Sequence, residues 1–215
     1  EKSNSINMKI NFDNDFIGNT NVYNVNKYRY AIIDGFLESV GEIHHLLHFA
    51  NKTKESYVIF CFGMSDQVKN TIIKNNADGK TEIIPISISF DENSVNILND
   101  IALIHKSDVI SSLKGQTISQ ELRKPLPVGE NIKIYKKGNI AIKPIASDID
   151  LMRHKNYLRN KIETSEKDIN TDVLEKRIKN LSTNSIKLFT PNDLLSDIRY
   201  SRDLDYFLRY LTNLN

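Results

Sequence analysis

The stretch Tyr57-Val-Ile-Phe-Cys-Phe62, followed by Gly63-Met-Ser65, decides the fold class. The continuous apolar run predicts a strand that is covered on both faces, as the strands of parallel sheets are. Ser65 or Asp66 then caps a helix that ends near residues 75–79, because short polar side chains accept hydrogen bonds from the free amides of a first turn. A buried strand that leads directly into a helix is the unit from which α/β sheets are built.

The same alternation extends outward on both sides. A buried strand at 30–34 precedes a helix over 39–50, which begins with Ser39 and Glu42 at capping-box spacing. A strand at 82–90 precedes a helix over 91–104 with Asp91 as its expected cap. The remaining predicted elements are a strand at 6–12, a loop at 13–27, a short strand at 108–111, a hairpin of 131–135 and 139–143, helices at 149–166 and 171–182, a strand at 186–188 and a helical tail. We therefore predict an α/β core with added antiparallel strands and flanking helices.

The amino-acid composition argues against several classes of function. The 215 residues suffice for one medium domain or for one domain with an appendage, and 40% hydrophobic content is typical of a globular chain. The 29 Lys and Arg are interspersed with 27 Asp and Glu, so we expect no nucleic-acid partner. No apolar run is long enough to cross a membrane, and residues 1–7 are too polar for a signal sequence. The single cysteine, Cys61, excludes a disulfide framework, and we expect a cytoplasmic setting and no membrane partner.

The residues with chemical potential do not assemble into a catalytic motif. His44 and His48 have helical spacing, but the Glu of an HExxH motif is absent, so we expect a polar helix face and no metal site. Cys61 ends an apolar strand and is expected to be a core residue, while Ser65 is expected to be a helix cap. Asp34 ends a strand but stands alone, and no phosphate-binding glycine motif is present. We therefore expect no catalytic residue and no cofactor.

Several strings, in one order along the chain, resemble the apical domain of the group I (GroEL-type) chaperonins. The most specific is Leu98-Asn-Asp-Ile-Ala102 followed by Val109-Ile-Ser111, which is similar to the family's LxDIA helix and VIS strand. The others are Asn11-Phe-Asp13, Glu42 with Leu46 and Leu47, Asn75 with Gly79, Leu158-Arg159-x-x-Ile162-Glu163, and Leu174-x-x-Arg177-Ile178-x-x-Leu181. The resemblance implies a swivelling β/β/α apical domain over residues 8–183. It further implies an intermediate-domain-like strand and helical tail over 184–215, with 1–7 a linker or disordered.

The part that resembles the intermediate domain departs from the family. The family's ATP-hydrolysing aspartate would fall on Asp205, but the GDGTTT nucleotide loop is absent from these residues, and a lone carboxylate cannot hydrolyse ATP. We therefore expect Asp205 to be a solvated helix residue and the chain to have no ATPase activity of its own. The family's interdomain ion pair is also broken, because Asn14 stands where Arg is usual, although Asp193 could supply the acid.

The resemblance also implies a binding site. The helices over 39–50 and 66–76 can form a groove for an extended or helical peptide. In the family such a groove binds non-native polypeptide segments and the mobile loop of the co-chaperonin. Carried over by position, the polypeptide-binding residues are Phe16, His44, Leu47, Lys69, Ile73 and Lys74. Three of these are polar where the family is apolar, so we expect weaker binding of generic apolar segments and a preference for acidic or amphipathic ones.

Three alternatives remain open. The chain is a fragment of a complete ATP-dependent ring chaperonin, or it is an apical-like scaffold repurposed for assembly with one specific partner, such as other chaperonin subunits. A third alternative, from another class, is a small α/β enzyme or metal protein that uses Asp34 and the histidines. Because rings of this family are held mainly by other domains, the resemblance implies that these residues alone form a monomer.

Overall fold

The computed structural model describes residues 2–3, 5–10, 16, 20–91, 93–136, 138–164, 171–182, 185–186, 202–204 and 206. The chain divides into two compact units, residues 4–184 and a smaller unit of residues 1–3 with 185–215. In the smaller unit, β1 (Lys2–Ser3) pairs antiparallel with β11 (Ser185–Ile186), and the described residues 202–204 and 206 are helical. Among the described helices, none is long and apolar enough to span a membrane.

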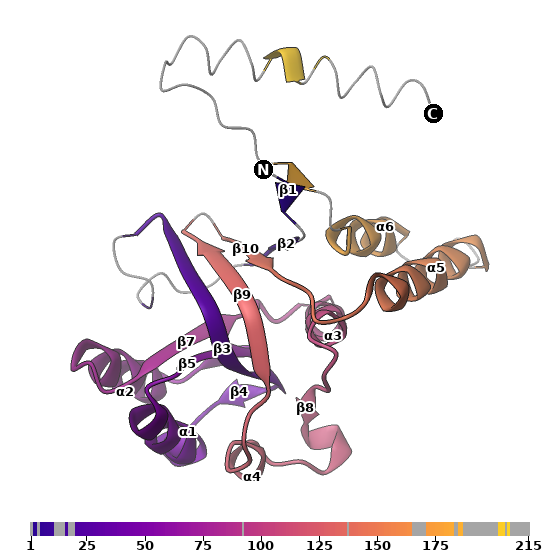
Figure 1. Ribbon diagram of the computed structural model, residues 1–215. Helices are drawn as coiled ribbons and strands as arrows, with labels where there is room; N and C mark the ends of the chain where they lie inside the picture. Colours follow the sequence, from indigo (N-terminus) through magenta and orange to yellow (C-terminus); the bar gives the residue numbers. More distant parts are fainter. Residues whose placement is uncertain are drawn as a thin grey trace. The chain divides into compact units, whose positions relative to one another are not determined.

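The larger unit is built on a seven-stranded mixed sheet with the order β2-β10-β9-β3-β5-β7, in which β8 pairs with β3 (Figure 1). Its strands are β2 (Ile6–Lys9), β3 (Val22–Asp34), β5 (Ser56–Cys61), β7 (Glu82–Ser87), β8 (Ile110–Ser111), β9 (Val128–Tyr135) and β10 (Asn139–Ile142). The strands β3, β5 and β7 are parallel, and β2, β10, β9 and β3 are joined by antiparallel pairs. The predicted α/β core with added antiparallel strands is confirmed.

The helices lie on both faces of this sheet (Figure 1). They are α1 (Val40–Thr53), α2 (Asp66–Ala77), α3 (Ser94–Ile104), α4 (Ile118–Glu121), α5 (Asp148–Thr164) and α6 (Thr171–Asn180), with a 3-10 turn at Ser112–Lys114. A separate two-stranded pair of β4 (Phe36–Leu37) and β6 (Gly63–Met64) is parallel. Each of these two strands lies directly before a helix, β4 before α1 and β6 before α2.

Strand β5 shows why both faces are covered. Tyr57, Ile59 and Cys61 belong to a core beneath α1 and α2, whereas Val58 and Phe60 belong to a second core with α3, α5 and α6. Side chains of a strand alternate between faces, so a continuous apolar run supplies both cores at once. We call these the α1–α2 core and the α3–α5–α6 core.

The sequence prediction was wrong where a strand forms from residues that lack an alternating apolar pattern. Residues 22–27, expected in a loop, form the first half of β3 and pair with β9 from Val22 to Arg29. Asn and Lys are uncommon in strands, but the β9 ladder satisfies their backbone groups and Val25 reaches the core. The short helix α4 and the 3-10 turn were missed because such elements are too short to show periodicity.

Smaller corrections concern boundaries. The strand predicted over 6–12 is confirmed as β2 from Ile6 to Lys9, and Ile6 is fully buried, so residues 6 and 7 belong to the sheet and not to the linker assigned to 1–7. Helix α3 begins at Ser94 after the cap position Asn93, and Asp91 accepts a hydrogen bond from the Asn93 amide at 2.8 Å. Two expected caps are confirmed: the Glu42 carboxylate accepts from the Ser39 amide at 3.1 Å, and the Ser65 hydroxyl accepts from the Val68 amide at 3.3 Å.

Candidate functional site

Helices α1 and α2 lie side by side on one face of the sheet (Figure 1). Each helix follows one strand of the parallel series β3-β5-β7, and the two connections proceed in the same direction across the sheet. Right-handed crossovers therefore place both helices on the same face, and the helices run parallel to one another. The β4–β6 pair, with Phe36 opposite Gly63 and Leu37 opposite Met64, joins the chain at their N-terminal ends. We call the outer side of this helix pair the α1–α2 surface.

Helix α1 has a buried stripe and an outer side. Ile43, Leu46 and Ala50 are buried in the α1–α2 core. Leu47 is half-buried and packs against the edge of that core, while His44 is exposed. The helix therefore offers one apolar side chain and one imidazole from the positions that the resemblance assigned to binding.

Helix α2 repeats this arrangement with different chemistry. Val68 and Ile72 are buried, whereas Lys69 and Ile73 are half-buried and Lys74 is exposed. Five of the six predicted binding residues thus lie on two neighbouring helices and remain at least partly accessible. The sixth, Phe16, is half-buried and packs against both cores, so its contacts are those of a packing residue. The binding roles of all six, and the groove itself, stay predictions.

Helices α1 and α2 carry charges of both signs, with Glu42 and Asp66 in their first turns. The Glu42 carboxylate accepts from the amides of Glu38 and Ser39, at 2.8 and 3.1 Å, and so serves as a cap for α1. Lys69 and Lys74 are the cations of the predicted site, and neither stem is fully buried. Long cationic side chains pack their methylene groups while the charge stays in water, so this surface presents apolar and positive groups together.

A second imidazole of α1 faces α4. The Arg123 guanidinium donates from Nε to His45 Nε2 at 2.9 Å. Desolvation, the Arg123 charge, and the neighbouring His44 and His48 all lower the pKa of His45. His45 is therefore held neutral as an acceptor, and it belongs to the α1–α4 contact rather than to the predicted binding positions.

One residue of this region was missed by the sequence. Phe36 is 48% exposed and lies at the N-terminal end of the helix pair, with its ring against Gly63. A Cβ at position 63 would lie 2.6 Å from Phe36 Cε1, and the backbone there has φ +154°, so glycine is required. The only sequence signal was an apolar residue directly after the Asp34-Gly35 turn, and that is too common to identify an exposed aromatic ring.

The candidates for catalysis are engaged in structural contacts. Cys61 is fully buried, and desolvation raises the pKa of its thiol to about 12, as expected of a core residue. The Ser65 hydroxyl caps α2, and Asp34 accepts from the Ser111 hydroxyl at 2.8 Å. His44 and His48 are both exposed, and the described residues hold no cluster of three or more His, Cys, Asp or Glu that could bind a metal.

Some sequence predictions fall on residues that the structure does not describe. They are Asn14 and Asp193 of the expected ion pair, and Asp205. Val22 and Tyr23, which fall in the loop predicted over 13–27, lie in β3, where the Tyr23 hydroxyl donates to Glu82 at 2.5 Å.

Cavities occur elsewhere in the larger unit. One of about 390 Å³ lies between β3, β8 and the loop at 124–127, and one of about 540 Å³ lies between the C-terminal end of α3 and α5. These two cavities are separate from the α1–α2 surface, because no residue of α1 or α2 lines them.

No family model matches this sequence. Among solved structures, the chain is similar to the chaperonin gp146 from the bacteriophage EL 2 (Pseudomonas aeruginosa) in presence of ATP-BeFx. In crystal form II the TM-score is 0.63 at 15% identity, over 84% of this chain and 37% of that chain. In crystal form I it is 0.61 at 15% identity, over 86% and 37%. This chain therefore spans little more than a third of the chaperonin's length, and it has a chaperonin-like α/β fold.

Proposed function

We propose that this chain is a chaperonin-type polypeptide-binding module, of the kind formed by the apical domain of group I chaperonins. The observation that carries the proposal is the pair of accessible apolar residues, Leu47 on α1 and Ile73 on α2, on parallel neighbouring helices of a chaperonin-like fold. Its role is to hold non-native polypeptide segments or a co-chaperonin loop, and it hydrolyses no ATP by itself.

The partner chemistry follows from the side chains around this pair. Covering a Leu or Ile side chain completely contributes about 1.5–3 kcal/mol, so Leu47, Ile73 and Phe36 together support only a modest apolar contact. Lys69 and Lys74 add positive charge, and the Glu42 carboxylate is engaged at the helix cap. The segment that fits best is amphipathic, with apolar residues beside Asp or Glu.

A second reading is supported by the lengths of the two proteins. The chain covers 37% of the similar chaperonin, which is what a module of a larger ring subunit would cover. In that reading the same surface acts within an ATP-dependent ring chaperonin. A third reading, an apical-like scaffold for one dedicated partner, is supported by the lysines at positions that are apolar in the family.

Fluorescence anisotropy with two labelled peptides tests the proposal. The first is an amphipathic helix-forming peptide with Leu and Glu on adjacent faces, and the second has the same apolar residues with Lys in place of Glu. We expect the acidic peptide to bind, and Leu47→Glu or Ile73→Glu to weaken it at least about tenfold, since a buried carboxylate replaces an apolar contact.

The matched control is Asn139→Glu, which adds the same charge at an exposed position of β10. Circular dichroism verifies that each variant is folded. Unchanged affinity in both α1–α2 variants rejects the proposed surface, and tighter binding of the Lys peptide rejects the acidic preference while leaving the surface in place.

A further inference from the structure

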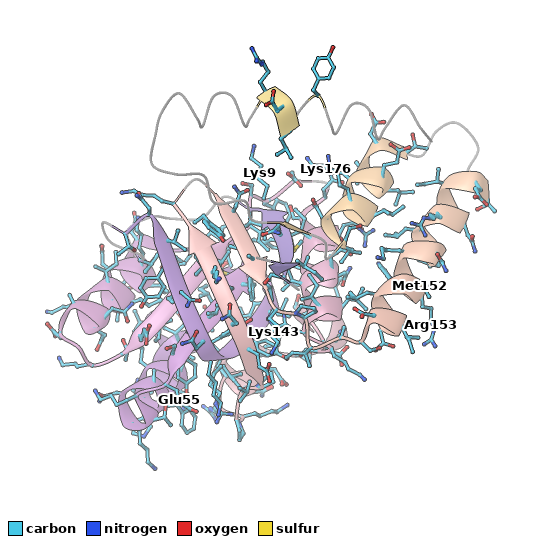
Figure 2. All side chains as sticks on the ribbon, turned by 45° about the horizontal axis from the view of Figure 1, so that its top comes forward. Lys9, Glu55, Lys143, Met152, Arg153 and Lys176 are labelled. Atoms are coloured by element: carbon cyan, nitrogen blue, oxygen red, sulfur yellow. The ribbon has the colours of Figure 1, made fainter. Side chains whose placement is uncertain are left out.

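A second accessible surface lies on the opposite side of the sheet, on α5. Leu151 and Leu158 of this helix are buried, yet Ile149, Met152 and Tyr157 are 64%, 56% and 56% exposed. Met152 and Arg153 of this helix are labelled in Figure 2. A helix that is apolar on its buried side and again on its outer side has apolar area left for a partner.

The same outer side of α5 is basic. Of the charged residues of α5, Arg153 and Lys161 lie on this side, together with one acid, Asp150. Helical periodicity puts Arg153 between Ile149 and Tyr157 on one face, and Lys161 Nζ lies 6.0 Å from the centroid of the Tyr157 ring. Apolar and positive groups therefore alternate along this face.

The cavity of about 540 Å³ adjoins this side of α5. Ala102, Leu103 and Ala146 line it with apolar groups, and Lys106 and Arg153 contribute cations. Both cations approach one carboxylate, that of Asp150, at 3.9 and 4.0 Å. A single carboxylate shared by two cations leaves the mouth of the cavity with net positive charge.

The chemistry of the cavity favours a polypeptide over a nucleic acid as the anionic partner. Its apolar lining has room for a large apolar side chain, such as Leu or Phe. The Asp150 carboxylate can accept a hydrogen bond from a peptide amide, whereas an ionised phosphodiester has no proton to donate to it. A peptide can place one carboxylate beside each cation and an apolar side chain between them, while a nucleic acid has a phosphate at every nucleotide.

We propose that this α5 face, formed by Lys106, Arg153 and Tyr157 around the cavity with Ile149 one turn from Arg153, binds an acidic polypeptide segment. One Leu or Phe side chain of the segment enters the cavity, and Asp or Glu residues beside it meet Lys106 and Arg153. This inference goes beyond the proposed function, because the α1–α2 surface lies on the other face of the sheet. The two surfaces can therefore hold two segments at once.

Fluorescence anisotropy with a short extended peptide tests the α5 face. The labelled probe has one Phe between Glu residues and carries Pro on both sides, so that it cannot form the helix expected to suit the α1–α2 surface. We expect it to bind the whole 215-residue chain, and to bind less tightly as sodium chloride is added, since exposed charges are screened. A matched probe with Ala in place of Phe should bind at least about fivefold more weakly, because it leaves the cavity unfilled.

Variants of the chain locate the contact. Arg153→Glu and Lys106→Glu are each expected to raise the dissociation constant at least about fivefold, because an attraction becomes a repulsion. Lys136→Glu, at an exposed position at the end of β9, is the matched control and leaves the affinity unchanged. The side chains of Lys106 and Arg153 are 70% and 79% exposed, so their reversal does not threaten folding, and circular dichroism verifies this.

Three outcomes overturn the proposal. They are an unmodified chain that binds neither probe, a loss in Lys136→Glu equal to that in Arg153→Glu, and an oligonucleotide of the same charge that binds this face more tightly than the Phe probe. Repeating the titrations with Leu47→Glu separates the two surfaces. That variant should bind the extended probe as the unmodified chain does, even if the α1–α2 surface proves to bind nothing.

Discussion

The two helical layers of the larger unit are fixed to the sheet by different means. The layer of α1 and α2 rests on apolar side chains such as Ile43, Leu46 and Ile72. The layer of α3, α5 and α6 has an apolar core too, but it also contains a buried charge and a buried imidazole, Asp100 and His105. Polar contacts require fixed geometry, whereas apolar packing tolerates adjustment, so the second layer is specified more tightly than the first.

The buried charge joins all three helices of the second layer. The Arg177 guanidinium of α6 donates to both Asp100 carboxylate oxygens, at 2.9 and 2.7 Å, and also to Asn96 at 3.0 Å. His154 of α5 lies 3.5 Å from the same carboxylate. Asp100 is only 1% exposed, so this pair is largely removed from solvent screening.

The largest expected effect comes from breaking that pair. We expect Asp100→Ala to cost about 3–5 kcal/mol of unfolding free energy, because the largely buried Arg177 guanidinium would lose its carboxylate and keep only the Asn96 side chain as a partner. Urea denaturation followed by circular dichroism measures the loss. Asn99→Ala, at the exposed neighbouring position, is the control and should change the stability by under about 0.5 kcal/mol. Equal losses in the two variants would mean that the pair does not anchor the layer.

The next largest effect is a pH dependence of stability that comes from the buried imidazole of His105. His105 donates from Nδ1 to the Ile101 carbonyl at 2.9 Å, so Nε2 of the neutral imidazole accepts from the Tyr28 hydroxyl at 2.8 Å. Desolvation lowers the pKa of His105 to about 4. The unfolded chain binds a proton near pH 6.5 and the folded chain does not. The contribution of His105 to the free energy of unfolding is therefore fully present above pH 6.5, and it falls by about 3 kcal/mol as the pH drops to 4.

Urea titrations at several pH values compare the native chain with His105→Gln. The variant lacks the titrating group, so its stability should decline less steeply between pH 6.5 and 4. Parallel pH profiles for the two proteins would show that His105 does not control the acid response of this layer.

The smallest effect concerns the packing of an aromatic ring against a glycine, which occurs once in each layer. Phe36 lies against Gly63 at the end of the α1–α2 surface, and Tyr28 lies against Gly129 beneath the other layer. We expect Gly63→Ala to cost about 1–3 kcal/mol, because the backbone is left in a conformation that L residues rarely adopt. Adding Phe36→Ala should recover the steric part but not the backbone part. Thermal unfolding of the single and double variants measures the split, and no recovery would mean that the ring moves aside without cost.

The sequence predicted the elements whose pattern is local. The apolar run at Tyr57–Phe62 and the caps Ser39 and Ser65 were sufficient for the parallel half of the sheet. The first half of β3 could not be predicted, because its strand character comes from pairing with β9, which is distant along the chain. The strand propensity of residues 22–27 does not depend on a partner that is distant in sequence, so it could not predict this pairing.

Only part of the candidate site could be predicted from the sequence. The helix positions of Leu47 and Ile73 follow from the resemblance, and the structure describes both as half-buried. The exposure of Phe36 depends on a contact with Gly63 across two strands, which no spacing rule contains. Similarly, the strings around Asp100 and Arg177 were each quoted for the resemblance, but their ion pair appears only when α3 and α6 meet.

The parallel course of α1 and α2 has an electrical consequence. Both helix dipoles point the same way, so their partial positive charges gather at the end beside Phe36 and their negative ends lie together beyond Thr53 and Ala77. A polypeptide laid along this surface would therefore meet a gradient of potential along the helix axes, in addition to the charges of Lys69 and Lys74. Two peptides of identical composition but reversed sequence are, for such a surface, different ligands.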